Sequence, residues 1–114
     1  MNISHEKIGP VTVARLEEKR LDAAMAVRFK DGMRPLADAV EDRLLLDMSH
    51  VEFMDSSGLG AIVALMKYLG PERTLDLCAL QPAVDKVFRL TRMDGVFTIY
   101  KSTDLALGAE AKSA

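Results

Sequence analysis

A short, almost wholly apolar run, Arg43–Met48, lies near the middle of the chain. A run of this length and composition is typical of a β-strand that is covered on both faces. The turn Glu52–Gly60 follows, and after it the apolar residues recur at the spacing of one helical face. Those residues are Leu59, Ile62, Val63, Met66 and Leu69. Gly70-Pro71 then predicts the end of the helix, because proline cannot continue it.

The segments before this run predict two strands and a helix. Val11–Leu16 reads as a strand and Glu17–Arg20 as a polar turn, so a short second strand ends near Leu21-Asp22. We expect these two strands to pair antiparallel at the edge of the sheet. The apolar residues of the following helix are Met25, Phe29, Met33, Leu36 and Val40. Pro35 lies inside this pattern and predicts a kink or a break near Gly32–Arg34.

The second half of the chain alternates between strand and helix. The predicted strands are Thr74–Leu80 and Val96–Tyr100, and Pro82 opens a helix between them at a favoured first position. The inner face of that helix carries Val84, Val87, Phe88 and Thr91, and a further helix spans Asp104–Glu110. Alternation of this kind predicts an α/β fold, with a mixed, mostly parallel sheet of four to five strands and the strand before Asp47 at its centre.

The chain of 114 residues predicts a single domain, 1–114, with a core of about 10–107 and a C-terminal tail that is loosely held beyond about Asp104. A net charge of -2 and the absence of Trp argue against nucleic-acid binding. The longest apolar run, Ala61–Met66, is too short to span a membrane, and Met1–Glu6 lacks the apolar part of a signal peptide. We therefore expect a cytoplasmic protein.

Few residues offer the chemistry of a metal or cofactor site. His5 and His50 stand alone, without a second ligand at metal-like spacing, so no metal and no cofactor is expected. Cys78, the single cysteine, lies in a strand-like segment and is expected to be a buried small hydrophobe. Lys86, Arg89 and Arg92 are read as a solvated helix face.

Two stretches carry a resemblance to a known family. Leu46-Asp47-Met48-Ser49, then Val51, then Phe53-Met54-Asp55-Ser56-Ser57-Gly58-Leu59-Gly60, resembles the signature of STAS domains, and specifically of stand-alone anti-sigma-factor antagonists. Arg20–Ala24 resembles the start of the family's first helix. The resemblance covers about residues 10–107, and its one departure is Met48, where Leu is common.

The resemblance implies a protein switch that is not an enzyme. Members bind an anti-sigma factor that is also a serine kinase of the histidine-kinase-like ATPase type, and they are released when it phosphorylates them. A PP2C-type phosphatase restores the unmodified form. By its place in the motif, the phosphorylated residue is Ser56. A monomer is expected because no fused domain is recognised in the sequence. Gly58 and Gly60 would leave the backbone open to the partner.

The residues around Ser56 are expected to contact the partner, and most of them also have a structural interpretation. The expected contacts are Asp22, Met54, Asp55, Ser57, Gly58 and Leu59. Ser57 and Asp22 could each cap a helix, and Asp55 could form the turn. Met54 and Leu59 could belong to the core, and Asp47 could accept hydrogen bonds from loop N–H groups.

Two other functions compete with the switch. One is a STAS scaffold subunit of a stressosome or a lipid-transport ATPase complex, with the serine unmodified. The other is a serine hydrolase that uses Ser56 or Ser57. The hydrolase is disfavoured, because the turn lacks a Gly-x-Ser-x-Gly elbow and only His5 and His50 could act as the base.

Overall fold

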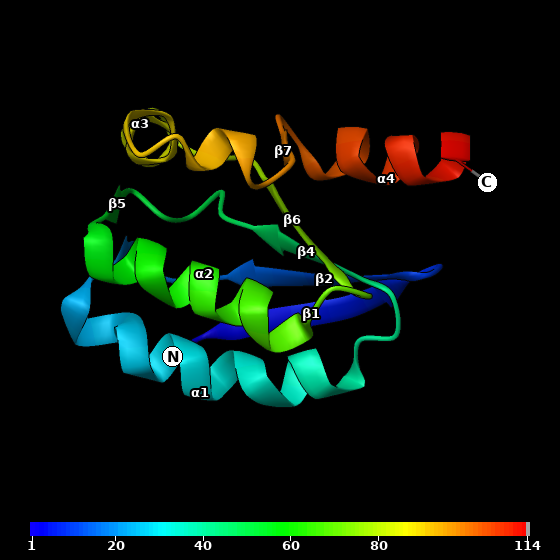
Figure 1. The fold of residues 1–114 in the computed structure, drawn as a ribbon, viewed down its shortest axis with the longest axis horizontal. Helices are drawn as coiled ribbons and strands as arrows, with labels where there is room; N and C mark the ends of the chain where they lie inside the picture. Colours follow the sequence, from blue (N-terminus) through cyan, green and yellow to red (C-terminus); the bar gives the residue numbers. More distant parts are fainter. Residues whose placement is uncertain (114) are drawn as a thin grey trace.

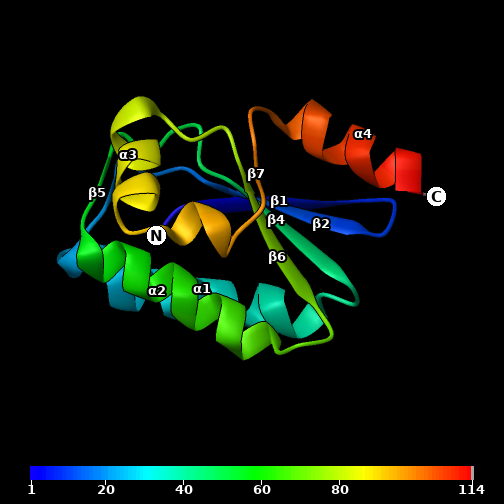
Figure 2. The same cartoon turned by 45° about the horizontal axis from the view of Figure 1, so that its top comes forward.

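The computed structural model describes residues 1–113, and their side chains as far as Gly108. They form a five-stranded sheet in the order β1-β2-β4-β6-β7, with a separate pair of short strands, β3 and β5 (Figures 1 and 2). The strands of the main sheet are β1 (Ile3–Ile8), β2 (Val11–Leu16), β4 (Arg43–Asp47), β6 (Thr74–Cys78) and β7 (Ile99–Tyr100). β1 pairs antiparallel with β2, and the other pairs are parallel. The predicted mixed, mostly parallel sheet is confirmed.

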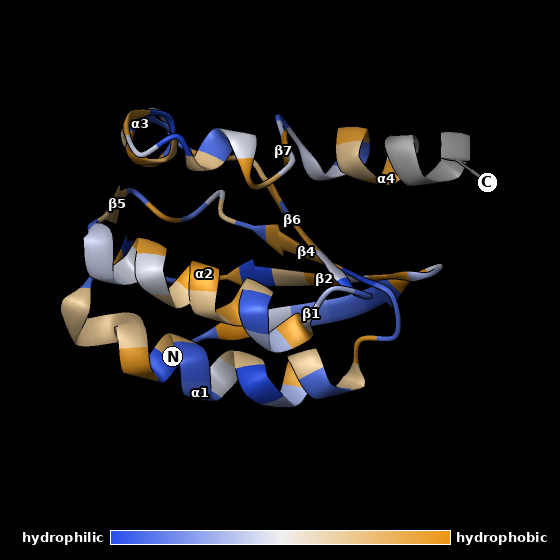
Figure 3. Cartoon of the chain, viewed as in Figure 1, coloured by the Kyte–Doolittle hydropathy of each residue, from blue (hydrophilic) through white to orange (hydrophobic). Residues whose placement is uncertain are grey.

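The central strand is β4, as predicted. All five of its residues are buried, and it pairs in parallel with β2 on one side and β6 on the other. Its side chains alternate between the two faces of the sheet. Leu44 and Leu46 join a large apolar cluster, whereas Leu45 joins a smaller one on the opposite face. The apolar run thus reflects cover on both faces (Figure 3).

Within residues 1–113, four helices pack on the two faces of the sheet: α1 (Ala23–Ala39), α2 (Ser56–Leu69), α3 (Pro82–Leu90) and α4 (Thr103–Ser113). α2 ends at Gly70, as predicted, and the φ of 79° at this residue is one that glycine adopts more readily than other residues. Of the kink or break predicted near Gly32–Arg34, the break is wrong, because α1 runs unbroken through Pro35. Buried residues on both sides of the proline, Met33 and Ala37, pack into the larger cluster and hold the helix together.

The observed strands differ from the predicted ones at three places. β1 was not predicted, because its sequence is polar and five of its six residues are exposed. β3 (Arg20–Leu21) does not pair antiparallel with the preceding strand; it pairs in parallel with β5 (Phe53–Met54). β7 covers only the end of the predicted Val96–Tyr100, because a 3-10 turn at Met93–Gly95 continues into a helical conformation at Val96.

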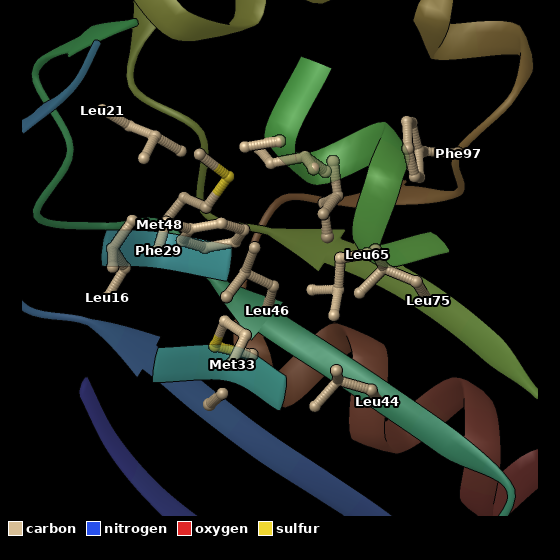
Figure 4. Close-up of a cluster of buried hydrophobic side chains, with 14 of the residues drawn as sticks. Leu16, Leu21, Phe29, Met33, Leu44, Leu46, Met48, Leu65, Leu75 and Phe97 are labelled. Carbon is tan, nitrogen blue, oxygen red and sulfur yellow. The ribbon is translucent and has the colours of Figure 1, made fainter. Parts of the chain in front are cut away.

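The larger cluster fills the space between the sheet and the helices α1, α2 and α3. Phe29 and Met33 of α1 and Leu65 of α2 point toward Leu44 and Leu46 of β4 (Figure 4). Phe88 of α3 adds an edge-to-face contact with Phe97, with ring centroids 5.9 Å apart. This cluster is the main apolar contribution to folding.

α4 covers part of the opposite face. Ala106 is fully buried against Val11, Val13 and Leu45, and its carbonyl accepts a hydrogen bond from Arg43 Nη1 at 3.3 Å. The buried Ala106 lies within the predicted core of about 10–107, and the loosely held tail after it stays a prediction. Ala114, the end of the expected tail, lies outside the described residues. Cys78 lies in the same cluster and is buried, as predicted.

Asp47, at the end of β4, joins three parts of the chain. Its carboxylate accepts hydrogen bonds from Ser49 N at 2.9 Å, Arg15 Nε at 3.0 Å and Thr103 Oγ1 at 3.3 Å. Burial alone would raise the pKa of this carboxyl, but the hydrogen bonds from Ser49 and Arg15 lower it below its ordinary value. The predicted role as an acceptor for loop N–H groups is confirmed.

We predict that Asp47→Asn lowers the free energy of unfolding at pH 7 by roughly 1–3 kcal/mol, since it removes charged hydrogen bonds in a buried site. A lowered native pKa stabilises the fold above the unfolded-state pKa, and this contribution is lost as the pH falls through the native value. The difference between variant and wild type should therefore shrink in urea titrations as the pH falls below about 4, the ordinary pKa of an aspartate. Glu72→Gln, at an exposed position, is the control. Equal stability of Asp47→Asn and wild type at pH 7 would contradict this.

Candidate functional site

Two helices begin side by side where β3 meets β5. The parallel pairing places Arg20 opposite Phe53 and Leu21 opposite Met54. One residue after each strand comes an aspartate, Asp22 or Asp55, in extended conformation at the N-cap of α1 or α2. The motif around Ser56 and the resembling segment around Asp22 are therefore brought together (Figure 1).

Asp55 connects the two helices through its carboxylate. Oδ1 accepts a hydrogen bond from Gly58 N at 3.0 Å and so caps α2, while Oδ2 accepts one from Ala23 N, in α1, at 3.2 Å. The capping role that we considered for Ser57 is therefore wrong, because Asp55 occupies the N-cap and Ser57 is the second residue of the helix. Asp55 fixes where the serine turn stands relative to α1; its contact with a partner stays a prediction.

Asp22 occupies the N-cap of α1, but its side chain does not cap the helix. Its carboxylate instead accepts a hydrogen bond from Arg20 Nε at 3.1 Å, while Met25 N donates to the backbone carbonyl of Asp22. The hydrogen bond from Arg20 lowers the pKa of the Asp22 carboxyl. The guanidinium of Arg20 also lies 4.4 Å from the centroid of the Phe53 ring. The predicted helix cap is right in position but wrong in its bonding.

Ser56 and Ser57 are the first two residues of α2, and both are exposed. The backbone N–H groups of a first helical turn have no acceptor within the helix, and the helix dipole makes this end positive. An anionic group on Ser56 would therefore meet favourable partial charges. The geometry meets the requirement that a kinase substrate be accessible.

Gly58 is required by a contact within the protein. A Cβ at this position would lie 2.0 Å from the carbonyl oxygen of Leu21 and 2.9 Å from Met54 Cγ. Gly58 is buried against β3, so it does not leave the backbone open as we expected, while its contact with a partner stays a prediction. Gly60 differs, because a Cβ there would meet nothing within 4 Å. Only Gly60 leaves the backbone open on the outer side.

Met54 and Leu59 are part of the core. Their exposed fractions are 3% and 8%, so the alternative that both belong to the core is confirmed, while their contact with a partner stays a prediction. Both side chains pack in the larger cluster, on the side of the serine turn that faces the core. Phe53, which we did not predict, is 41% exposed beside the turn. Strand alternation could have shown this, because Phe53 and Met54 must point to opposite sides.

No group of three or more His, Cys, Asp or Glu residues that could hold a metal ion occurs in the part of the chain that the structure describes. None of the helices in that part is long and apolar enough to cross a membrane.

Comparison with known proteins gives consistent relatives. The STAS domain family model matches residues 2–106. "Putative anti-sigma factor antagonist BtrV" of Bordetella bronchiseptica is 26% identical over 110 residues, which cover 96% of this chain and 94% of that protein.

Solved structures agree with this comparison. An anti-sigma factor antagonist from Mycobacterium paratuberculosis superimposes with a TM-score of 0.85 at 28% identity, over 95% of this chain and 92% of that one. The Bacillus cell fate determinant SpoIIAA in its phosphorylated form gives a TM-score of 0.68 at 20% identity, over 95% and 98% of the two chains. The second likeness shows the fold alone, and the predicted α/β fold is confirmed.

The two glycines of the turn provide a matched pair of variants. We predict that Gly58→Ala lowers the free energy of unfolding by about 1–3 kcal/mol or more, because the new methyl group overlaps the backbone of Leu21. Gly60→Ala should instead raise it by about 0.5–1 kcal/mol, since alanine favours the helix and the space is open. Chemical denaturation of both variants checks the prediction. Equal effects of the two substitutions would show that the close approach to Leu21 is not what restricts position 58.

Proposed function

This chain belongs to the STAS domain family, and we propose that it acts as an anti-sigma factor antagonist, a protein-binding switch with no catalysis of its own. In the unmodified form it holds an anti-sigma factor that is also a serine kinase, and phosphorylation of Ser56 releases that partner. The single observation that carries the proposal is the exposed Ser56 side chain at the start of α2, on a turn held by Asp55. The names of the two most informative relatives support the antagonist function.

The covalent step uses ATP bound to the kinase. The oxygen of Ser56 would form a bond to the γ-phosphorus as the bond to ADP breaks, and a base on the kinase would take the hydroxyl proton. The product carries about -1.5 to -2 charges at neutral pH. That a neighbour in fold, SpoIIAA, has a structure in a phosphorylated form supports this assignment.

The added charge should act mainly on the interface. The positive end of α2 would favour a phosphate by roughly 0.3–1 kcal/mol, whereas the nearby carboxylate of Asp55 would oppose it. These contributions to the fold are small and of opposite sign. Desolvating an unpaired phosphate against a partner would cost several kcal/mol. Since about 1.4 kcal/mol corresponds to a tenfold change in affinity, binding should be lost while the fold is kept.

The proposed cycle requires two partners and one compartment. The kinase would be of the histidine-kinase-like ATPase type, and a PP2C-type phosphatase would hydrolyse the phosphoserine and restore binding. We place the cycle in the cytoplasm, where ATP and sigma factors meet. The surface offered to the kinase would comprise Ser56, Ser57, Phe53 and the start of α1 around Asp22.

A hydrolase is not supported by the geometry. Within residues 1–113, His5 lies on β1 and His50 in the loop after β4, and neither forms a hydrogen bond with Ser56 or Ser57. A serine nucleophile needs such a base within reach.

Titration against each purified anti-sigma factor of the source organism, with and without ATP, tests the proposal. We expect one of them to bind the unmodified protein and to add a single phosphate, seen by intact mass, that is absent in Ser56→Ala and present in Ser57→Ala. The phosphorylated form should bind that partner at least about 100-fold more weakly. Amide NMR shifts between the two forms should stay near the turn.

Three results would contradict the proposal. If the Ser56→Ala variant is phosphorylated as well as the Ser57→Ala variant, the modified residue is not Ser56. Stable binding without any phosphate transfer would favour the scaffold subunit. Binding to none of the anti-sigma factors would remove the antagonist function altogether.

A further inference from the structure

A shallow groove runs between α1 and α2, away from the sheet. We call it the two-helix groove and define it by Val27, Lys30 and Arg34 of α1 and Ala64 and Tyr68 of α2. Four of these residues, all except Val27, line a small hollow of about 80 Å³ together with Leu65. The two helices lie side by side along their length in both views (Figures 1 and 2).

Two apolar side chains are exposed along this groove. Val27 is 62% exposed although it lies well inside α1, and Tyr68 is 43% exposed near the end of α2. Single exposed apolar residues are ordinary on protein surfaces. These two belong to neighbouring helices whose facing side chains line the hollow. They therefore offer apolar contact at two points of one surface.

The aromatic side chain of the groove is held in place by two neighbours. Tyr68 donates a hydrogen bond from its hydroxyl to Asp38 Oδ1 at 2.5 Å, and the guanidinium of Arg34 lies 5.1 Å from its ring centroid. A tyrosine and an arginine that are already ordered lose little side-chain entropy when a partner binds. These are also the residue types that dominate the energy of protein interfaces.

The charge of this layer differs from that of the rest of the chain. The helices α1 and α2 carry four basic residues and two acidic ones, in a chain whose net charge is -2. The basic residues are Arg28, Lys30, Arg34 and Lys67, and the acidic ones are Asp31 and Asp38. One of the two carboxylates, Asp38, already accepts the bond from Tyr68. The layer therefore has a net charge of +2, and Lys30 and Arg34 place positive charge on the groove.

The groove is continuous with the serine turn. Ser57, Ala64 and Tyr68 are spaced by seven and four residues, which places them on one face of α2. On α1 the same spacing rule joins Ala23, Val27, Lys30 and Arg34. The hydrogen bond from Ala23 N to Asp55 ties the two helices together at the end where Ser56 lies.

We propose that the two-helix groove is a second docking surface for the anti-sigma factor and that it receives an acidic, amphipathic segment of that partner. Apolar side chains of the segment would cover Val27 and Tyr68, and its carboxylates would face Lys30 and Arg34. The inference rests on the proposed function, because it assigns part of the same partner. A helix laid along a groove is a common recognition mode and meets both requirements.

Charge reversal tests this surface. The double variant Lys30→Glu/Arg34→Glu is compared with Lys86→Glu/Lys101→Glu, which has the same net charge but changes exposed residues on α3 and after β7. For the unmodified protein and the anti-sigma factor that binds it, we expect a Kd at least tenfold higher for the first variant and within twofold of wild type for the second. The affinity of the wild type should also fall with salt more steeply than that of the first variant.

A second variant keeps the test independent of charge. Val27→Ser removes apolar contact without changing charge and should raise the Kd about fivefold, with the thermal unfolding of every variant confirming that it is folded. Reversing an acidic residue of the partner segment to Lys should restore binding to Lys30→Glu/Arg34→Glu.

The outcomes separate this inference from the proposed function. If phosphorylation of Ser56 releases the partner but both groove variants bind like wild type, the groove is not a docking surface and the switch stands. If no anti-sigma factor binds wild type, the proposed function fails and the groove proposal fails with it. If the protein alone forms dimers that Val27→Ser dissociates, the groove binds a second copy and the proposal is overturned.

Discussion

The structure around the serine turn depends on one close approach between backbones. The carbonyl of Leu21, at the end of β3, lies so near to Gly58 that no other residue type fits at that position without displacement. This approach brings the start of α1 within reach of Asp55, whose carboxylate then binds N–H groups of both helices. Ser56 is therefore displayed on a support made from two segments that are more than thirty residues apart in the chain. A loop without these contacts would offer the same hydroxyl in many orientations.

The sheet provides the rigid base for this support. β4 is buried on both faces, and β2 and β6 pair with it in register on either side. On the face toward α4, a buried ion pair joins Arg43 to Asp76 at 2.7 Å. Buried pairs of this kind add little stability after desolvation, but a shift of one residue between β4 and β6 would separate the charges. The ion pair thus favours one register, and the register sets where the segment after β4 begins its turn toward Ser56.

Local patterns in the sequence were enough to predict much of the fold. The apolar run at Arg43–Met48, the helix ending at Gly70 and the proline at the start of α3 each depend on residues next to one another, and each prediction is confirmed. β1 was missed because an edge strand with exposed polar residues has no apolar pattern, although the Gly9-Pro10 turn after it was a usable signal. The pairing of β3 with β5 involves two residues on each side, too few to show a period.

The serine turn shows the same limit within a single motif. Its position and its exposure follow from the strand–turn–helix pattern. The structural role of each residue in the turn does not follow from this pattern. It depends on contacts with β3 and α1, which are distant in sequence. Gly58 and Leu59 read equally well from the sequence as a surface for a partner and as internal packing, and only the structure shows that both are buried. The motif therefore identifies the turn, while the structure says which of its side chains face outward.

These contacts also bear on how a modification at the turn would be transmitted. Both oxygens of the Asp55 carboxylate are occupied by N–H groups, and the side chains beneath the turn belong to the core. A phosphate on Ser56 would add charge at the surface of an already satisfied network, with no buried bond that it must replace. The two helices would then keep their positions, and any surface between them would keep its shape. Release of a partner would then result from the charge that it meets at one end of the interface, rather than from a rearrangement of the turn.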